Sequence, residues 1–146
     1  KGWFESRYLH KPVNRNGNPI PWMTYSSIHF INEKLKLKPM SVFEYGSGNS
    51  TLWFASRVEN IISIENDAVL IIDGRERVQC AKNCIKSLKK EGVIIFDNSD
   101  RIKYKEAYNF LENNQFKKLE FKGAGPISHI EWKTTIYYRE NNCFEI

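Results

Sequence analysis

Acidic, amide and glycine residues follow three apolar segments of this 146-residue chain, and these residue types suit ligand binding and proton transfer. The first segment ends in Glu44-Tyr-Gly-Ser-Gly-Asn-Ser-Thr51. Two later apolar runs, 69–72 and 93–96, end in Asp73 and in Asp97-Asn98. Glycines let a backbone approach a ligand without a Cβ clash, and carboxylates accept protons or bind cations. We therefore expect ligand chemistry where these segments end.

The glycine-rich turn predicts a cofactor site of the nucleotide type. Another apolar run, 61–64, ends in Glu65, which follows Gly46 by 19 positions (65 − 46). This is close to the ~20-residue spacing at which an acid reaches a ribose hydroxyl. The dinucleotide fingerprint needs a third glycine where Thr51 stands, and a phosphate-binding loop needs a Gly-Lys sequence that is absent there. Glu44 would instead face a positively charged ligand; the alternative is a tight turn that binds nothing.

The polar residues after the two later runs are candidate metal ligands. The carboxyl ends of parallel strands meet at one edge of a sheet, and the oxygens of Asp73, Asp97 and Asn98 suit Mg²⁺ or Ca²⁺. The alternative is that Asp73 caps the next helix and Asp97-Asn98 forms a turn. Without a metal ion, Asp97, Asp73 or Asp100 would act as the general base.

Candidate substrate-binding residues lie in the N-terminal segment and shortly after Asp73. Trp22 and Tyr25 follow the stiff Pro19-Ile-Pro21 sequence, so their rings could form a substrate lid or a plug on the core. Arg75 could hold an anionic substrate or pair with the neighbouring acids. Both alternatives stay open for each of these residues.

Hydrophobic periodicity predicts an α/β domain that positions these residues. We expect irregular structure over residues 1–23, because this segment holds several prolines and glycines. The predicted helices span 26–36, 50–58, 77–90 and 104–113, and Gly92 should follow the end of the third. The predicted strands span 41–45, 61–65, 68–72, 93–96, 116–121 and 134–139, the last two forming an antiparallel pair. In the second helix, Leu52, Phe54 and Ala55 should pack inward.

At this length we expect a single domain, 1–146. Within it, residues 1–40 would form an N-terminal lid and helix, and 41–146 a Rossmann-like core. One junction is inconsistent with that core, because only three residues separate strands 61–65 and 69–72. Parallel strands need a crossover of about a dozen residues. Either these strands form a hairpin, or a strand-helix segment is missing after Asp67, which is the alternative that we favour. Asp67 and Ala68 should then lie much farther apart than the ~3.8 Å between adjacent Cα atoms.

The composition limits the partners and the compartment. Lysine and arginine exceed aspartate and glutamate by 22 to 17, which permits an anionic partner such as RNA. The lysines gather near predicted helix ends, where the dipole favours cations, so a solvated basic surface is the alternative. No apolar run is long enough to span a membrane. Three cysteines, an odd number, argue against a disulfide framework and predict a reducing, cytoplasmic location.

Four segments together resemble class I S-adenosylmethionine (SAM)-dependent methyltransferases. They are Glu44–Thr51, Ile72-Asp-Gly-Arg-Glu-Arg-Val78, Gly92-Val-Ile-Ile-Phe-Asp-Asn98 and Thr134-Thr-Ile-Tyr-Tyr138. The chain is most similar to a bacterial group often encoded with surface-polysaccharide genes. The resemblance implies a seven-stranded Rossmann-like sheet, mostly parallel with a reversed last strand. The Asp, Asp, Asn pattern also resembles metal-dependent catechol-type O-methyltransferases.

The resemblance implies SAM as cofactor and O-methylation of a small-molecule or glycan-like substrate, in polysaccharide biosynthesis. The implied cofactor-binding residues are Glu44, Tyr45, Gly46, Ser47, Gly48, Asn49, Ser50, Thr51 and Glu65. Two alternatives remain. The chain could methylate RNA, or it could be a degenerate methyltransferase fold that binds a partner without catalysis, which a genuine gap after Asp67 would favour.

Overall fold

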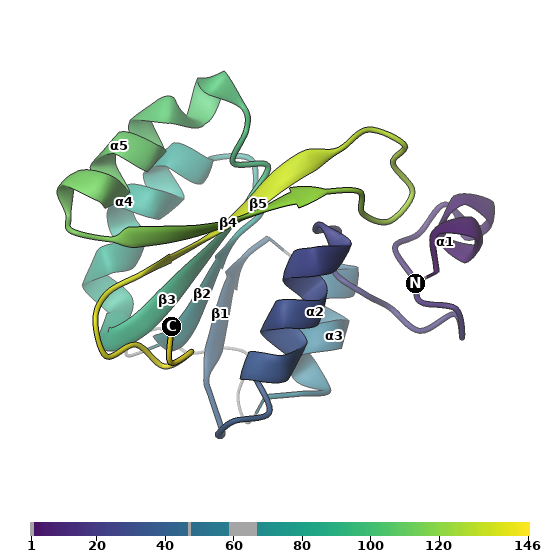
Figure 1. Ribbon diagram of the computed structural model, residues 1–146, viewed down its shortest axis with the longest axis horizontal. Helices are drawn as coiled ribbons and strands as arrows, with labels where there is room; N and C mark the ends of the chain where they lie inside the picture. Colours follow the sequence, from purple (N-terminus) through teal and green to yellow (C-terminus); the bar gives the residue numbers. More distant parts are fainter. Residues whose placement is uncertain (1, 47, 59–66) are drawn as a thin grey trace.

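The computed structural model of the chain describes residues 2–46, 48–58 and 67–146, and these contain one mixed β-sheet (Figure 1). Its strands are β1 (Val42–Tyr45), β2 (Asp67–Ile72), β3 (Leu88–Asp97), β4 (Lys117–Gly123) and β5 (Trp132–Tyr138). Their order across the sheet is β1-β2-β3-β5-β4. The first three strands are parallel, whereas β5 is antiparallel to both of its neighbours. The predicted mostly parallel sheet with an antiparallel C-terminal pair is therefore confirmed.

Helices cover both faces of the sheet (Figure 1). They are α2 (Tyr25–Lys34), α3 (Asn49–Ala55), α4 (Arg77–Ser87) and α5 (Lys105–Asn113), with a 3₁₀ turn η1 (Ile102–Tyr104) before α5. A further helix, α1 (Trp3–Leu9), lies away from the sheet beside the β4–β5 loop (Figure 1). Successive strand residues point to opposite faces. Val69 and Ile71 thus join the core cluster beneath α2 and α3, while Leu70 and Ile72 join the cluster beneath α4 and α5. This burial on both faces explains the unbroken apolar run of β2.

Two expectations about helices are corrected, one for residues 1–23 and one for α3. Residues 3–9 form α1 instead of irregular chain, and distant contacts hold this helix: the Trp3 indole donates to the Ser128 carbonyl at 2.9 Å, and Ser6 bonds the backbone of Val13. In α3, Leu52 is 60% exposed and Ala55 is also exposed. The inward face of α3 carries Trp53 and Phe54 instead.

The helix predicted over 77–90 ends at Ser87, because the next residue already belongs to the sheet. Leu88 begins β3 and pairs with Asp67 of β2. Gly92 therefore lies inside a strand and does not stop a helix. A Cβ at this position would come within 2.5 Å of the Leu88 side chain. Close packing within the strand therefore explains why residue 92 is a glycine.

The expected separation of Asp67 and Ala68 is wrong, because both residues belong to the continuous strand β2. The strand predicted over 61–65 lies outside the described residues. Within the described part, β2 pairs directly with β1 in parallel, and β1 forms an edge of the sheet. The described sheet thus has five of the seven strands that the resemblance implies.

The helices of the described part are too short or too polar to cross a membrane. Cys80, Cys84 and Cys143 are free thiols. Burial raises the pKa of Cys84 to about 12 and that of Cys143 to about 11, so both behave as small apolar core residues.

Candidate functional site

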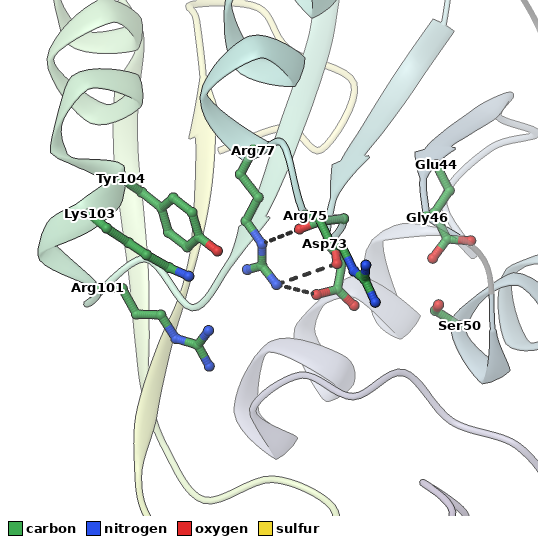
Figure 2. A pocket seen from close by; sticks show the side chains of 10 residues that line it. Glu44, Gly46, Ser50, Asp73, Arg75, Arg77, Arg101, Lys103 and Tyr104 are labelled. Atoms are coloured by element: carbon green, nitrogen blue, oxygen red, sulfur yellow. Dashed lines mark hydrogen bonds and ion pairs between the residues drawn. The ribbon is translucent and has the colours of Figure 1, made fainter.

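A cavity of about 460 Å³ lies where the parallel strands β1 and β2 end (Figure 2). Three segments line it: the turn after β1, the segment between β2 and α4, and the loop after β3. The lining residues are Glu44, Gly46, Ser50, Asp73, Gly74, Arg75, Arg77, Arg101, Lys103 and Tyr104. The sheet therefore brings the predicted glycine turn and Asp73 to one pocket, as the convergence of strand ends requires.

The Glu44 carboxylate is held by the first turn of α3. The Thr51 hydroxyl donates to Glu44 Oε2 at 2.6 Å and accepts from the Gly48 N–H at 3.1 Å. Gly46 has a φ of 125°, which a residue with a side chain rarely adopts. A Cβ on Gly48 would meet no atom of the described residues within 4 Å. The turn thus presents one fixed carboxylate, Glu44, to the cavity.

The other predicted cofactor residues have different surroundings. Ser50 is buried and lines the cavity. The Asn49 side chain donates to the Pro12 carbonyl at 2.8 Å, so it holds the N-terminal segment. The Tyr45 ring packs edge-on against Phe43, while its carbonyl would lie 3.0 Å from a Cβ on Gly74. Ser47 and Glu65 lie outside the described residues.

Asp73 is held by Arg77, an ion pair that the sequence analysis did not predict. Arg77 is 6% exposed, and its Nη2 lies 2.8 Å from Asp73 Oδ1. The same guanidinium donates to the Gly74 carbonyl at 2.9 Å and to the Asp97 carbonyl. Arg77 therefore ties the ends of β2 and β3 together. Asp73 precedes α4 and Arg77 begins it, so the four-residue spacing alone did not identify the pair.

The Asp73 carboxyl has an unusually high proton affinity. Burial, and after it the nearby Asp97 carboxylate, raise its pKa to about 7, although the Arg77 guanidinium opposes the rise. The sequence offers Arg75 as a possible partner of the acids, but the arginine that pairs with Asp73 is Arg77. A pKa near neutrality suits a general base.

A second cavity of about 560 Å³ adjoins the first and shares Asp73, Arg77 and Arg101 with it. Its further lining residues are Trp22, Asp97, Asn98, Asp100, Ser128, Ile130, Glu131 and Trp132. Asp97 is 2% exposed, and its Oδ1 accepts from Trp132 Nε1 at 3.0 Å and from the Thr134 hydroxyl at 2.6 Å. Burial raises its pKa. Asp97 thus fastens the antiparallel strand β5 to the end of β3.

The predicted ligands do not provide the oxygen cage that Mg²⁺ or Ca²⁺ requires. The cation beside Asp73 is the Arg77 guanidinium, and Asp97 Oδ1 is taken up by Trp132 and Thr134. In residues 2–46, 48–58 and 67–146, no three histidine, cysteine, aspartate or glutamate side chains form a group that could hold a metal ion. The geometry therefore gives the metal prediction no support.

Some of the remaining candidate residues line one of the two cavities, and others do not. Trp22 lines the second cavity, as does Asp100, whose Oδ1 accepts from the Lys133 backbone N–H at 3.1 Å. Tyr25 lines neither cavity and packs against the core cluster beneath α2 and α3. Lys103 and Tyr104 line the first cavity, and sequence reasoning missed both of them.

Comparison with known proteins identifies the fold class. No family model matches the chain, and no curated protein matches it. The chain is similar to the crystal structure of precorrin-6Y C5,15-methyltransferase from Geobacter metallireducens GS-15, with a TM-score of 0.56 and 12% identity, over 89% of this chain and 98% of that one. A domain provisionally assigned as the same enzyme in Corynebacterium diphtheriae matches with a TM-score of 0.42 and 9% identity, over 75% and 92% of the chains. The first likeness shows a Rossmann-like methyltransferase fold.

Proposed function

We propose that the chain is a SAM-dependent methyltransferase that methylates a hydroxyl group of a small or glycan-like substrate. One observation carries the proposal: a fixed carboxylate, Glu44, and a carboxyl with a near-neutral pKa, Asp73, line one cavity at the strand ends. The fold likeness to a methyltransferase structure supports the same class.

The residues around the glycine turn fit the methionine end of SAM. Its ammonium and sulfonium groups are cationic, and Glu44 supplies a carboxylate held by Thr51. The space that the described residues leave open at Gly48 and the positive φ at Gly46 let the turn approach a ligand closely. Glu65 stays a prediction for the ribose hydroxyls. When bound, SAM would supply a methyl group on a positively charged sulfur.

Asp73 is the general base of the proposed reaction. With SAM bound as the methyl donor, the acceptor oxygen would gain the methyl group and lose its proton to Asp73. Arg77 is a positioning residue, because its bonds to Asp73 and to the Gly74 carbonyl fix the carboxyl at the cavity wall. Holding the acceptor in line with the methyl group supplies most of the remaining rate enhancement.

The rate of methyl transfer should rise with pH as Asp73 loses its proton. Because the pKa of Asp73 is raised to about 7, the base is mostly protonated below that pH and mostly ionised above it. We expect kcat to rise through about pH 7 and Asp73→Asn to lower kcat by about 100-fold or more. A pH series with both proteins measures this. An unchanged rise in the Asp73→Asn variant would assign the base elsewhere.

Removing the Thr51 hydroxyl should weaken cofactor binding. The Thr51→Val variant keeps the side-chain volume but loses the hydrogen bond to Glu44, and a hydrogen bond to a charged group is worth about 1.5–3 kcal/mol. We therefore expect the affinity for S-adenosylhomocysteine to fall by about tenfold or more. The Thr51→Ser variant keeps the hydroxyl and should retain the affinity. Equal affinities of the two variants would contradict this role for Thr51.

A methyl-transfer assay tests the proposed activity. The full chain is incubated with methyl-labelled SAM and a panel of small hydroxylated compounds and glycan fragments, and products are identified by mass spectrometry. We expect a labelled ether or ester product that the Asp73→Asn variant forms far more slowly. Binding of S-adenosylhomocysteine without turnover of any acceptor would favour the non-catalytic alternative. The supporting observation for that alternative is that β1 forms an edge of the described sheet, which has five of the seven strands that the resemblance implies.

RNA is the less favoured substrate because glutamates lie among the surface lysines. In the described part of the chain, six lysines form ion pairs with glutamates: Lys36, Lys38, Lys82, Lys117, Lys118 and Lys133. Such pairing reduces the positive charge available to phosphates. An RNA substrate would require binding that weakens steeply as salt concentration rises.

A further inference from the structure

The first cavity has an acidic end and a basic end. Figure 2 shows Arg101 and Lys103 across the pocket from Glu44 and Ser50, with Asp73 and Arg77 between them. Of the four cations that line this cavity, Arg77 alone forms an ion pair within the described part of the chain. The acidic end already has a role in the proposed cofactor site, whereas the basic end has none.

The basic end is built on a fixed loop. The backbone N–H of Arg101 donates to the Asn98 carbonyl at 3.2 Å, and the Arg101 carbonyl accepts from Tyr104 N–H at 3.0 Å and the Tyr108 hydroxyl at 3.1 Å. Tyr104 is buried against Phe96 in the core. The backbone that carries Arg101 and Lys103 is therefore held in place, although both side chains are exposed.

Two cations share one aromatic ring at this end. The Lys103 ammonium lies 4.8 Å from the centre of the Tyr104 ring, and the Arg77 guanidinium lies 5.2 Å from it. The ring attracts both cations, but it supplies no negative charge to neutralise Lys103. An anion held by Lys103 and Arg101 would supply that charge and would gain charge-assisted hydrogen bonds.

We infer that the basic end of this cavity, formed by Arg101 and Lys103, binds an anionic group of the methyl acceptor. This rests on the proposed function and specifies its substrate class: a hydroxylated small molecule or glycan that carries a phosphate or carboxylate group. With that group bound at the basic end, the rest of the acceptor lies toward Asp73 in the middle of the cavity, where the proton would be removed.

Inorganic phosphate and citrate are the probes for this site, measured on the full chain by calorimetry and thermal unfolding at constant ionic strength. We expect saturable binding of at least one anion. The Arg101→Gln/Lys103→Gln variant should bind it at least about tenfold more weakly, since one charge-assisted hydrogen bond is worth about that factor. The matched control is Lys89→Gln/Lys90→Gln, which removes the same charge from exposed residues of β3 that line neither cavity. Stronger binding of phosphate than citrate would indicate a phosphorylated acceptor, and the reverse a carboxylated one.

S-adenosylhomocysteine separates this inference from the proposed function. It should bind equally well to the wild type and to both charge variants, and it should not displace phosphate. Absence of saturable anion binding, equal losses in the two variants, or mutual displacement of phosphate and S-adenosylhomocysteine would overturn the inference. Anion binding in a chain that binds no S-adenosylhomocysteine would instead leave the anion site standing and contradict the methyltransferase.

Discussion

Replacing Arg77 by methionine should lower the free energy of unfolding by about 3–5 kcal/mol, the cost of breaking a buried ion pair and leaving its partner uncompensated. Arg77 is 6% exposed and bonds Asp73 together with the backbone carbonyls of Gly74 and Asp97. Methionine fills much of the same volume but satisfies none of these acceptors. Urea unfolding followed by circular dichroism measures the loss.

A matched ion pair on the same helix provides the control for this loss. Lys82 of α4 pairs with Glu106 near the surface, so Lys82→Met should cost less than about 1 kcal/mol. The double variant Arg77→Met/Asp73→Asn should recover part of the Arg77 loss, because the buried carboxylate is then neutral. Equal losses in the free energy of unfolding for Arg77→Met and Lys82→Met would contradict the conclusion that Arg77 ties the ends of β2 and β3 together.

The Gly48→Val variant should fold normally and lose cofactor binding. Gly48 has a φ of 164°, an extended conformation that valine adopts readily, and a Cβ there would meet no atom within 4 Å in residues 2–46, 48–58 and 67–146. The added side chain would occupy the space that we assign to the ligand, next to the cavity residues Gly46 and Ser50. We expect the affinity for S-adenosylhomocysteine to fall by about 100-fold or more, equivalent to about 2.8 kcal/mol.

The Leu52→Val variant is the control for this substitution, since it introduces the same side chain on the exposed side of α3. Thermal unfolding of both variants shows whether they fold, and calorimetry compares their affinities. Leu52→Val should bind S-adenosylhomocysteine like the wild type. Undiminished binding by Gly48→Val would place the ligand away from the glycine turn.

The features that the sequence predicted correctly depend on local patterns. The glycine turn after β1 and the unbroken apolar run of β2 indicated the parallel sheet, and the β4–β5 pair was also predicted. The convergence of strand ends then placed Asp73 beside the turn. These inferences needed only periodicity and the geometry of parallel strands.

The features that the sequence did not predict depend on contacts between distant residues. The hydrogen bond from Trp3 to Ser128, 125 positions apart in the sequence, accompanies α1 in a segment that its prolines and glycines predicted to be irregular. Asp97 accepts hydrogen bonds from Trp132 and Thr134 of the antiparallel strand β5. The residues next to Asp97 in the sequence gave no sign that its carboxylate would hold β5. The helix predicted over 77–90 ends three residues early, at Ser87, for the same reason, because pairing with β2 draws Leu88 into the sheet.

The proposed methyltransferase is best tested by calorimetric titration of the full chain with S-adenosylhomocysteine. We expect saturable binding at one site per chain, which Glu44→Gln weakens and Gly48→Val reduces by about 100-fold or more, while Leu52→Val leaves it unchanged. No binding heat and no shift in Tm at about 1 mM ligand, a concentration that fills even a weak site, would contradict the proposed methyltransferase.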